Sequence, residues 1–368
     1  MKFLDEFRAP ESCRRLLERI RAAASREWTI MEVCGGQTHG LLRYGIDQEL
    51  GGCVRLVHGP GCPVCVTPLE SIDFAITLAR RDDTLLASFG DMLRVPGSRE
   101  SLLQVRAATG NVRVVYSPLD AVTLAQKTPD KQIVFFAVGF ETTTPATALA
   151  VQQASRLGLK NFSLLVSHVR VLPAMELLAG DPGNGINGFL AAGHVCTVGG
   201  FDTYEEFTAR YKLPVVVTGF EPVDLLTGIL ECVEQLERHE ATVANCYSRS
   251  ARREGNRAAL SLIDAIYEPC DRPWRGLGVV PMGGMRLRAE WAEWDAQRRF
   301  QQEMPPVAEP AECRSGEVLT GRIKPPDCEC FATRCTPESP LGAPMVSAEG
   351  ACAAYYRYAL ARRDPGTR

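Results

Sequence analysis

The chain has 368 residues and a net charge of −3, with 45% hydrophobic and 23% charged residues. This balance is typical of a globular protein with more than one core, and it lacks the basic excess that nucleic acid or an anionic membrane would attract. The first residues carry charges where a signal peptide needs an apolar run, and no apolar stretch approaches the roughly 20 residues of a membrane span. We expect a cytoplasmic protein that binds neither nucleic acid nor membrane.

Short apolar stretches rich in β-branched residues alternate with helical patterns through the middle of the chain. The sequence predicts strands at 29–33, 85–89, 112–116, 133–138, 163–166 and 215–218, and helices that include 69–80, 118–126 and 145–156. This alternation is typical of parallel βαβ units, so we expect an α/β fold. A helical pattern is predicted from 224 to 299, followed by a proline-rich connector, a cysteine-rich segment of loops and a terminal helix at 351–362.

The first chemically distinctive motif is CGGQTH, directly after the first predicted strand. It holds a thiol, two glycines, two polar side chains and an imidazole: Cys34, Gly35, Gly36, Gln37, Thr38 and His39. We expect Thr38 to cap the next helix, so that the preceding residues form the turn. Glycines admit a close ligand, and a soft thiolate suits low-spin iron whose small ligands accept polar hydrogens. A Cys34 nucleophile with His39 as its base, or an inert turn, are the alternatives.

The motif GPGCPVC carries the pair Cys62 and Cys65. A C-x-x-C pair forms a redox disulfide or supplies two thiolates to a metal. Thr67, Pro68 and Glu70 resemble the N-cap, first residue and capping-box acid of a helix, which would leave Cys65 two residues before it. No second close pair completes a zinc site, so we favour redox chemistry.

A third motif, GFETTTP, follows the strand predicted at 133–138, and a weaker copy, GFEPVD, follows the strand at 215–218. Its polar residues are Glu141, Thr142 and Thr143, with Thr143 or the next threonine as the helix cap. Free backbone N–H groups at such a turn bind anions or polar ligands. A tight strand-to-helix turn is an equal alternative for the first copy and the preferred interpretation of the second.

Fourteen cysteines occur in the chain, and in a reducing compartment they favour metal or redox chemistry over a disulfide framework. The last sixth of the chain has the spacing C-x14-C-x6-C-x16-C, formed by Cys313, Cys328, Cys335 and Cys352, with Cys330 as an extra thiol. No tight zinc knuckle is present, and widely spaced thiolates suit a [4Fe–4S] cluster. Zinc and reduced core thiols remain alternatives.

Together these motifs, with the stretch CECFATRCTPESPLGAPMVSAEGACAAYYRY, resemble the HypD family of hydrogenase maturation proteins over nearly the whole chain. The resemblance implies a scaffold, with redox activity, in place of a conventional turnover enzyme. Its members pair with the small chaperone HypC to assemble the Fe(CN)2CO unit of [NiFe]-hydrogenases. Cyanide arrives from HypE, which works with HypF.

The resemblance also implies two Rossmann-like α/β domains, which we expect at 28–127 and 128–228. A helical, loop-rich iron–sulfur domain would comprise 1–27 and 229–368. The cluster ligands would be the four spaced cysteines, with Cys330 as an alternative ligand. Cys34 would hold the iron under assembly, with His39 beside it, and Cys62 and Cys65 would be the redox pair.

These implications combine into one hypothesis for the mechanism. Electrons would pass from the cluster through the Cys62–Cys65 dithiol to iron on Cys34, where Gly35, Gly36 and neighbouring polar groups hold the diatomic ligands. The rival is an iron–sulfur thiol–disulfide oxidoreductase, which needs the cluster and the C-x-x-C pair but has no use for CGGQTH. A structural zinc protein without a redox role is a third class.

Overall fold

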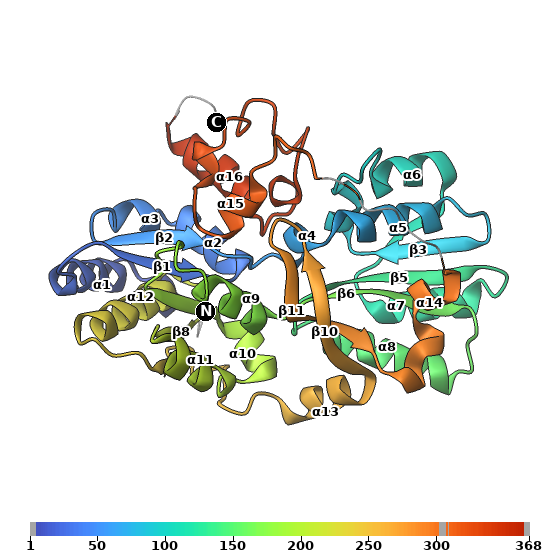
Figure 1. Ribbon diagram of the computed structural model, residues 1–368, viewed down its shortest axis with the longest axis horizontal. Helices are drawn as coiled ribbons and strands as arrows, with labels where there is room; N and C mark the ends of the chain where they lie inside the picture. Colours follow the sequence, from blue (N-terminus) through green and yellow to red (C-terminus); the bar gives the residue numbers. More distant parts are fainter. Residues whose placement is uncertain (1–4, 302–306, 308, 364–368) are drawn as a thin grey trace.

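Two parallel β-sheets, each covered by helices on both faces, form most of the computed structural model (Figure 1), which describes residues 5–301, 307 and 309–363. The predicted α/β fold with parallel sheets is thereby confirmed. Among the described helices, none is both long and apolar enough to cross a membrane.

The larger sheet contains five strands in the order β2-β1-β7-β8-β9, and every neighbouring pair is parallel. Their bounds are Trp28–Glu32 (β1), Val54–His58 (β2), Gly188–Ala192 (β7), Val215–Thr218 (β8) and Val243–Asn245 (β9). Ile30, at the centre of β1, pairs with Leu56 on one side and Gly188 on the other. The carboxyl ends of β1, β2, β7 and β8 therefore lie side by side at one edge, and ligands of open α/β sheets bind at this end of the strands.

The smaller sheet has four parallel strands in the order β4-β3-β5-β6. They span Thr84–Ser88 (β3), Val112–Val114 (β4), Gln132–Gly139 (β5) and Phe162–His168 (β6). Phe135 and Phe136 of β5 are both fully buried, on opposite faces of the sheet. Burial of each ring stabilises the fold by roughly 2–3 kcal/mol.

Helices cover each sheet on both faces. Around the larger sheet they are α1 (Pro10–Ala23), α2 (Gly35–Arg43), α3 (Ile46–Glu49) and α12 (Pro222–Glu237), with α9 (Val171–Ala179), α10 (Gly193–Gly199) and α11 (Thr203–Tyr211). Around the smaller sheet they are α5 (Leu69–Ala79), α6 (Leu102–Thr109), α7 (Pro118–Lys127), α8 (Thr144–Arg156), α13 (Arg257–Ile266) and α14 (Ala296–Phe300).

The chain divides between the sheets differently from the expected boundary at 127/128. Strands β1 and β2 belong to the larger sheet, β3 to β6 form the smaller one, and the chain then returns to the larger sheet with β7 to β9. Segments 28–127 and 128–228 each contribute strands to both sheets. Sequence periodicity identifies strands, but the choice of neighbour depends on tertiary packing, so this division was not visible in the sequence.

The helical pattern expected from 224 to 299 is wrong over much of its length. After α12 the chain forms β9 and α13, and then an antiparallel hairpin of β10 (Tyr267–Trp274) and β11 (Gly278–Leu287). Exposed and less exposed residues alternate along β10, a period of two that the charged and proline residues obscured. The turn uses Gly276 and Gly278 with φ of 79° and 77°, values that glycine adopts without strain.

The cysteine-rich C-terminal segment packs across the ends of both sheets (Figure 1). It contains α15 (Ser315–Leu319), the 3₁₀-helix η5 (Ala343–Met345) and α16 (Ala351–Arg363). Helix α16 contacts α2, while η5 contacts the one-turn helix α4 (Pro63–Val66). The segment thus reaches both N-terminal cysteine motifs.

Candidate functional site

Cys34 lies between the end of β1 and the start of α2. Its extended backbone, with φ −150° and ψ 125°, makes it the N-cap residue of α2, which begins at Gly35. The prediction that Thr38 caps this helix is therefore wrong: Thr38 lies inside α2, and its backbone N–H donates to the carbonyl of Cys34. We predicted a turn because Gly35 and Gly36 are adjacent in the sequence, but both glycines lie in the first turn of α2. The thiol is buried, with 4% exposure.

The loop before Cys62 lies directly on the backbone of Cys34. The N–H of Gly35 donates to the carbonyl of Gly61 at 3.1 Å. A Cβ atom added to Gly61 would overlap the backbone nitrogen of Cys34, so only glycine permits this approach. The two motifs CGGQTH and GPGCPVC, which are separate in the sequence, therefore form one packed unit.

The imidazole that contacts the Cys34 sulfur is His194, whose Nδ1 lies 3.7 Å from Sγ. His194 follows β7 at the start of α10, and burial lowers the pKa of its ring. Its ring lies 5.2 Å from that of Phe220, which also packs on Gly36. Phe220 belongs to the second GFE copy, which we interpreted only as a turn. The sequence did not point to His194, because 160 residues separate it from Cys34.

Burial strongly raises the pKa of the Cys34 thiol, and the carboxylate of Glu32 acts in the same direction. The backbone N–H groups of Gln37 and Gly36 oppose this rise, because they point toward the sulfur and stabilise negative charge on it. Without a cation Cys34 is thus a neutral thiol. A bound metal ion would supply the positive charge that a buried thiolate needs.

His39 lies against the C-terminal helix. The hydroxyl of Tyr358 is 3.0 Å from His39 Nε2, and the two rings meet edge to face with their centroids 4.9 Å apart. Burial lowers the pKa of His39, and the positive charges of Arg43 and Arg357 lower it further. The ring is therefore neutral at physiological pH. We expected His39 beside Cys34, whereas the structure gives that position to His194.

The two polar side chains of the motif are engaged within the protein. Gln37 donates from Nε2 to the carbonyl of Ala191 at 3.2 Å and to Thr218 Oγ1 at 2.8 Å, and Thr38 donates its hydroxyl to Glu32. The donor groups of both side chains are therefore engaged, whereas Gln37 Oε1 is buried and has no hydrogen-bond partner among the described residues.

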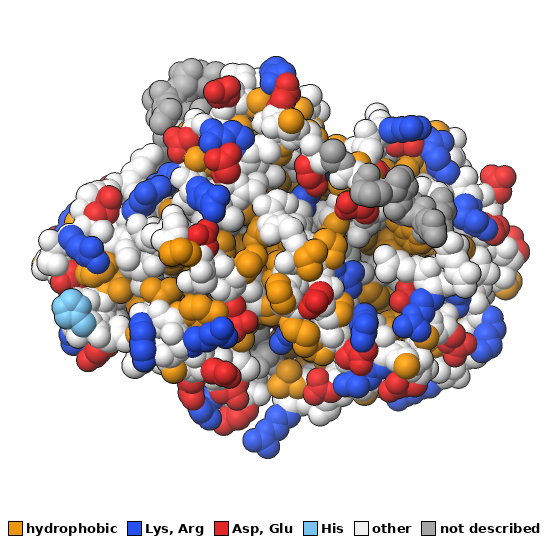
Figure 2. Space-filling view, viewed as in Figure 1, with side chains coloured by type: hydrophobic (Ala, Val, Ile, Leu, Met, Phe, Trp, Pro, Cys, Tyr) orange, Lys and Arg blue, Asp and Glu red, His pale blue; other side chains and the backbone are white. Residues whose placement is uncertain are grey.

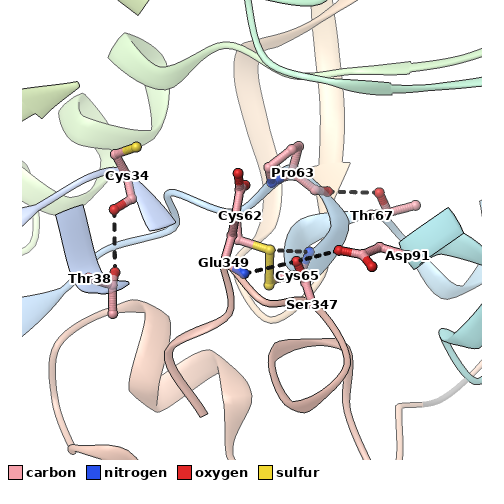
Figure 3. Close-up of a disulfide and its surroundings, with 9 residues drawn as sticks. All are labelled: Cys34, Thr38, Cys62, Pro63, Cys65, Thr67, Asp91, Ser347 and Glu349. Carbon is pink, nitrogen blue, oxygen red and sulfur yellow. Dashed lines mark hydrogen bonds between the residues drawn. A yellow bond between two sulfur atoms is a disulfide. The ribbon is translucent and has the colours of Figure 1, made fainter. Parts of the chain in front are cut away.

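Cys62 and Cys65 form a disulfide (Figure 3). Cys62 is the N-cap of α4, and its sulfur accepts the N–H of Cys65 at 3.1 Å. Cys65 precedes α5, the helix predicted from 69, as expected, but it lies within the separate one-turn helix α4, which was not predicted. Thr67 ends α4 and donates its hydroxyl to the carbonyl of Pro63, so it does not cap α5. The sequence pattern predicted a single helix here, whereas the structure has two successive helices, α4 and α5, which meet at Thr67 and Pro68.

The GFETTTP motif forms the turn between β5 and α8. Glu141 accepts the N–H of Val171 at Oε1, with a distance of 2.9 Å, while Oε2 is buried and finds no hydrogen-bond partner among the described residues. Burial raises the pKa of this carboxyl group. Thr142 is half-buried, and Thr143 is the N-cap residue, with its hydroxyl donated to the carbonyl of Phe140. A ligand role for these three residues stays a prediction.

Five C-terminal thiols line one small cavity of about 20 Å³: Cys313, Cys328, Cys330, Cys335 and Cys352. Among the described residues, no three His, Cys, Asp or Glu side chains are arranged to hold a single metal ion. The Cys335 sulfur accepts the N–H of Leu341 at 3.4 Å. Burial strongly raises the pKa of Cys352, and the charges of Cys313, Cys335 and Cys328 raise it further. The four predicted ligands therefore act on one another across the cavity.

Cys330 differs from these four in its partner. Its sulfur lies 3.3 Å from Nη2 of Arg334, whose guanidinium also pairs with Glu312 at 2.9 Å. The side chain is 6% exposed. Cys330 thus has a cationic hydrogen-bond donor of its own within the protein.

The cysteine-rich segment brings its own backbone against the Cys34 turn. A Cβ atom on Gly35 would overlap the carbonyl oxygen of Glu349, so the two backbones touch there. Ser347 donates its hydroxyl to Asp91 at 3.4 Å, close to the disulfide in Figure 3. The 3₁₀-helix η5 lines the thiol cavity and also packs on α4, which carries the disulfide. It is therefore the element between the cavity and the disulfide.

A family model named HypD, described as "Hydrogenase formation hypA family", matches residues 11–359. The chain belongs to the HypD family. It is 47% identical to the hydrogenase expression/formation protein HupD of Azotobacter chroococcum and to the hydrogenase maturation factor HypD of Azotobacter vinelandii, in both cases over 99% of this chain and 98% of the relative. It is 43% identical to the hydrogenase maturation factor HypD of Escherichia coli, over 97% of this chain and 98% of that protein. The predicted resemblance is confirmed, and the chain is a hydrogenase maturation factor at the family level.

Proposed function

We propose that this chain acts in the cytoplasm as the scaffold on which the Fe(CN)2CO unit of a [NiFe]-hydrogenase is assembled. The iron would be bound by Cys34 and by a thiolate of a HypC-type chaperone, and cyanide would come from HypE charged by HypF. The packing around Cys34 is the observation that best supports this proposal. A buried thiol meets the backbone N–H groups of Gly36 and Gln37, and the loop of the Cys62–Cys65 pair lies on its backbone.

The chemistry of this donor set fits low-spin iron with cyanide and CO. A thiolate is a soft ligand, and His194 adds an imidazole 3.7 Å from it. The N–H of Gly36, which points toward the sulfur, would offer a hydrogen to a cyanide nitrogen, whereas the N–H groups of Gly35 and Gln37 already donate to the carbonyls of Gly61 and Cys34. A free Cys34 thiolate is strongly disfavoured by burial, so iron binding and loss of the thiol proton should occur together.

We propose a [4Fe–4S] cluster in the C-terminal cavity, with Cys313, Cys328, Cys335 and Cys352 as its ligands. Four thiols around one cavity, and a backbone N–H bond to the Cys335 sulfur, are features of iron–sulfur sites. No three ligands among the described residues are arranged to hold a single metal ion, and a cube of iron and sulfide, which is wider than one ion, takes four thiolates. Such a cluster would supply electrons one at a time.

The chain's own redox group is the Cys62–Cys65 disulfide. Two electrons and two protons convert it to a dithiol, breaking the S–S bond. Helix α4 places the pair between η5, which lines the thiol cavity, and the loop that touches Cys34. This position suits transfer of reducing equivalents from the cavity toward the iron site.

Infrared spectroscopy tests the scaffold role. The chain is co-purified anaerobically with a HypC-type partner, and the cyanide and CO bands are compared between the wild type and Cys34→Ser. We expect the variant to lose these bands, because a hydroxyl binds soft iron poorly. Cys13→Ser, which changes a thiol on α1, is the matched control and should keep them. Normal bands in Cys34→Ser would contradict the proposal.

The rival function, an iron–sulfur thiol–disulfide oxidoreductase, draws support from the disulfide itself. Exchange with a protein disulfide needs an accessible sulfur, however, and Cys62 and Cys65 are 3% and 1% exposed. We therefore expect no turnover with disulfide substrates. A redox titration with thiol trapping separates the two ideas: the scaffold needs a pair that cycles internally, whereas the rival also needs rapid reaction with added disulfides.

A further inference from the structure

A buried carboxylate beside Cys34 has three hydrogen-bond donors around it. Glu32, the last residue of β1, is fully buried. Its Oε2 accepts the backbone N–H of Cys34 at 2.8 Å, and its Oε1 accepts from His58 Nδ1 at 2.7 Å and from the hydroxyl of Thr38. Burying a carboxylate is costly unless such bonds replace water, so these donors are required for the fold of the turn.

His58 extends this network to the C-terminal helix. It ends β2, next to β1, and its Nε2 lies 3.2 Å from the hydroxyl of Tyr355 on α16. Because the carboxylate of Glu32 can only accept, Nδ1 carries the hydrogen, and in the neutral ring Nε2 then accepts from Tyr355. His58 is 2% exposed and Tyr355 4%, so water does not compete for these bonds.

Tyr355 ties this network to the cysteine cavity. It lies three residues after Cys352 on α16, which is one helical turn. Packing supports the same connection, because Leu42 of α2 forms a buried apolar cluster with Ala354 and Tyr355. The close approach of the Gly35 and Glu349 backbones is a second, independent contact between α2 and the cysteine-rich segment.

We propose that Glu32, His58 and Tyr355 are positioning residues that make the geometry at Cys34 depend on the seating of the cysteine-rich segment. When α16 is seated, Tyr355 orients His58, His58 orients the carboxylate, and the carboxylate holds the N–H of Cys34. When α16 is displaced, the carboxylate loses an oriented donor and the Cys34 turn loosens. The proposal rests on the proposed role of Cys34 for its biological meaning, although its structural content does not require iron.

Tyr355→Phe tests this chain, because it removes one hydroxyl and keeps the ring. Hydrogen exchange of the Cys34 amide and the rate of Cys34 alkylation, both followed by mass spectrometry, report the turn. Loss of a buried hydrogen bond predicts about tenfold faster exchange and alkylation. Tyr356→Phe is the matched control: it removes a hydroxyl from the adjacent residue, whose ring packs on Phe331. It should leave both rates unchanged.

Glu32→Gln should have a larger effect than Tyr355→Phe. The new side-chain NH2 group would face a hydrogen-bond donor, such as the N–H of Cys34, where the carboxylate now supplies an acceptor. If that variant fails to fold, Tyr355→Phe and His58→Gln still decide the proposal, with circular dichroism to confirm folding. Wild-type rates in a folded Tyr355→Phe variant, or equal acceleration in Tyr356→Phe, would overturn the positioning chain. Missing cyanide and CO bands in the wild type would instead refute the scaffold function and leave these exchange rates meaningful.

Discussion

The two cysteine regions of this molecule are built in different ways. Cys34, Cys62 and Cys65 lie at strand ends and helix starts, and hydrogen bonds from the parallel sheet set their positions. Four of the C-terminal thiols come from loops joined by short helices such as α15 and η5, whereas Cys352 lies in the first turn of α16, and all five meet around a small cavity. Figure 2 shows this segment as a separate lobe on top of the body.

The difference shows where each region gets its stability. The sheet region has a fully buried apolar core on both faces of its strands, and this core does not need a ligand. Around the C-terminal thiols the buried apolar cluster is small, with Met345 beside Cys330 and Cys335, so ligand bonds there would add to limited hydrophobic burial. The predictions below test this contrast.

The largest effect is expected for Cys352→Ser. With one ligand removed, anaerobic reconstitution should fall from about four irons per chain to almost none. The segment 313–352 should then exchange its amides faster, while β5 and β6 keep their protection. Iron analysis and hydrogen exchange measure both effects, and Cys270→Ser, a thiol on the hairpin, serves as the control. Full iron content in Cys352→Ser would show that the cavity does not hold the proposed cluster.

Acid should destabilise the sheet region through His168. Its ring is buried at the end of β6, bonded to Thr147 and to the carbonyl of Gly139, and burial lowers its pKa to about 4. An unfolded chain binds this proton near pH 6.5, so the contribution to the free energy of unfolding is full above about 6.5. It falls by up to about 3 kcal/mol as the pH drops toward 4.

Chemical denaturation between pH 7 and pH 4 measures this dependence. His168→Gln should flatten the loss of stability, whereas His239→Gln, which changes an exposed imidazole after α12, should keep the wild-type slope. An unchanged slope in His168→Gln would show that other groups control acid unfolding of the sheets.

Gly35→Ala should separate the two regions by a steric clash. The added methyl group would overlap the carbonyl of Glu349, and backbone cannot move aside as a flexible side chain can. We expect a loss of about 1–3 kcal/mol in the free energy of unfolding and faster exchange around residues 347–350. Gly199→Ala, at the end of α10 with open space around it, is the control. If Gly35→Ala and Gly199→Ala were equally stable, the backbone contact between Gly35 and Glu349 would have to adjust at little cost in free energy.

Cys330→Ser should have the smallest effect. Cys330 bonds to Arg334, whereas Cys313, Cys335 and Cys328 act on Cys352, so the variant should keep its iron and its absorption spectrum. Iron analysis of Cys328→Ser in parallel makes the comparison. Loss of iron in Cys330→Ser together with retention in Cys328→Ser would assign the ligand role to Cys330.

Local pattern in the sequence was sufficient for some of the buried strands, although β2 and β7 were not predicted. The strands predicted at 133–138 and 163–166 lie within β5 and β6, because runs of β-branched and aromatic residues have few other stable conformations. Strand β7 was missed, since its sequence GFLAA is short and weakly β-forming. The hairpin of β10 and β11 was missed because charged and proline residues hide its alternation.

The sequence by itself determined the α/β class, the thiol motifs and the family, since these depend on residue type and on spacing along the chain. Only the tertiary structure showed that His194 faces Cys34, and that Tyr355 reaches His58 across 297 residues. It also decided which strands share a sheet. The physical reason is that periodicity reports whether a segment is buried, whereas the partner that buries it depends on how the strand ends and helix faces of the whole chain pack together.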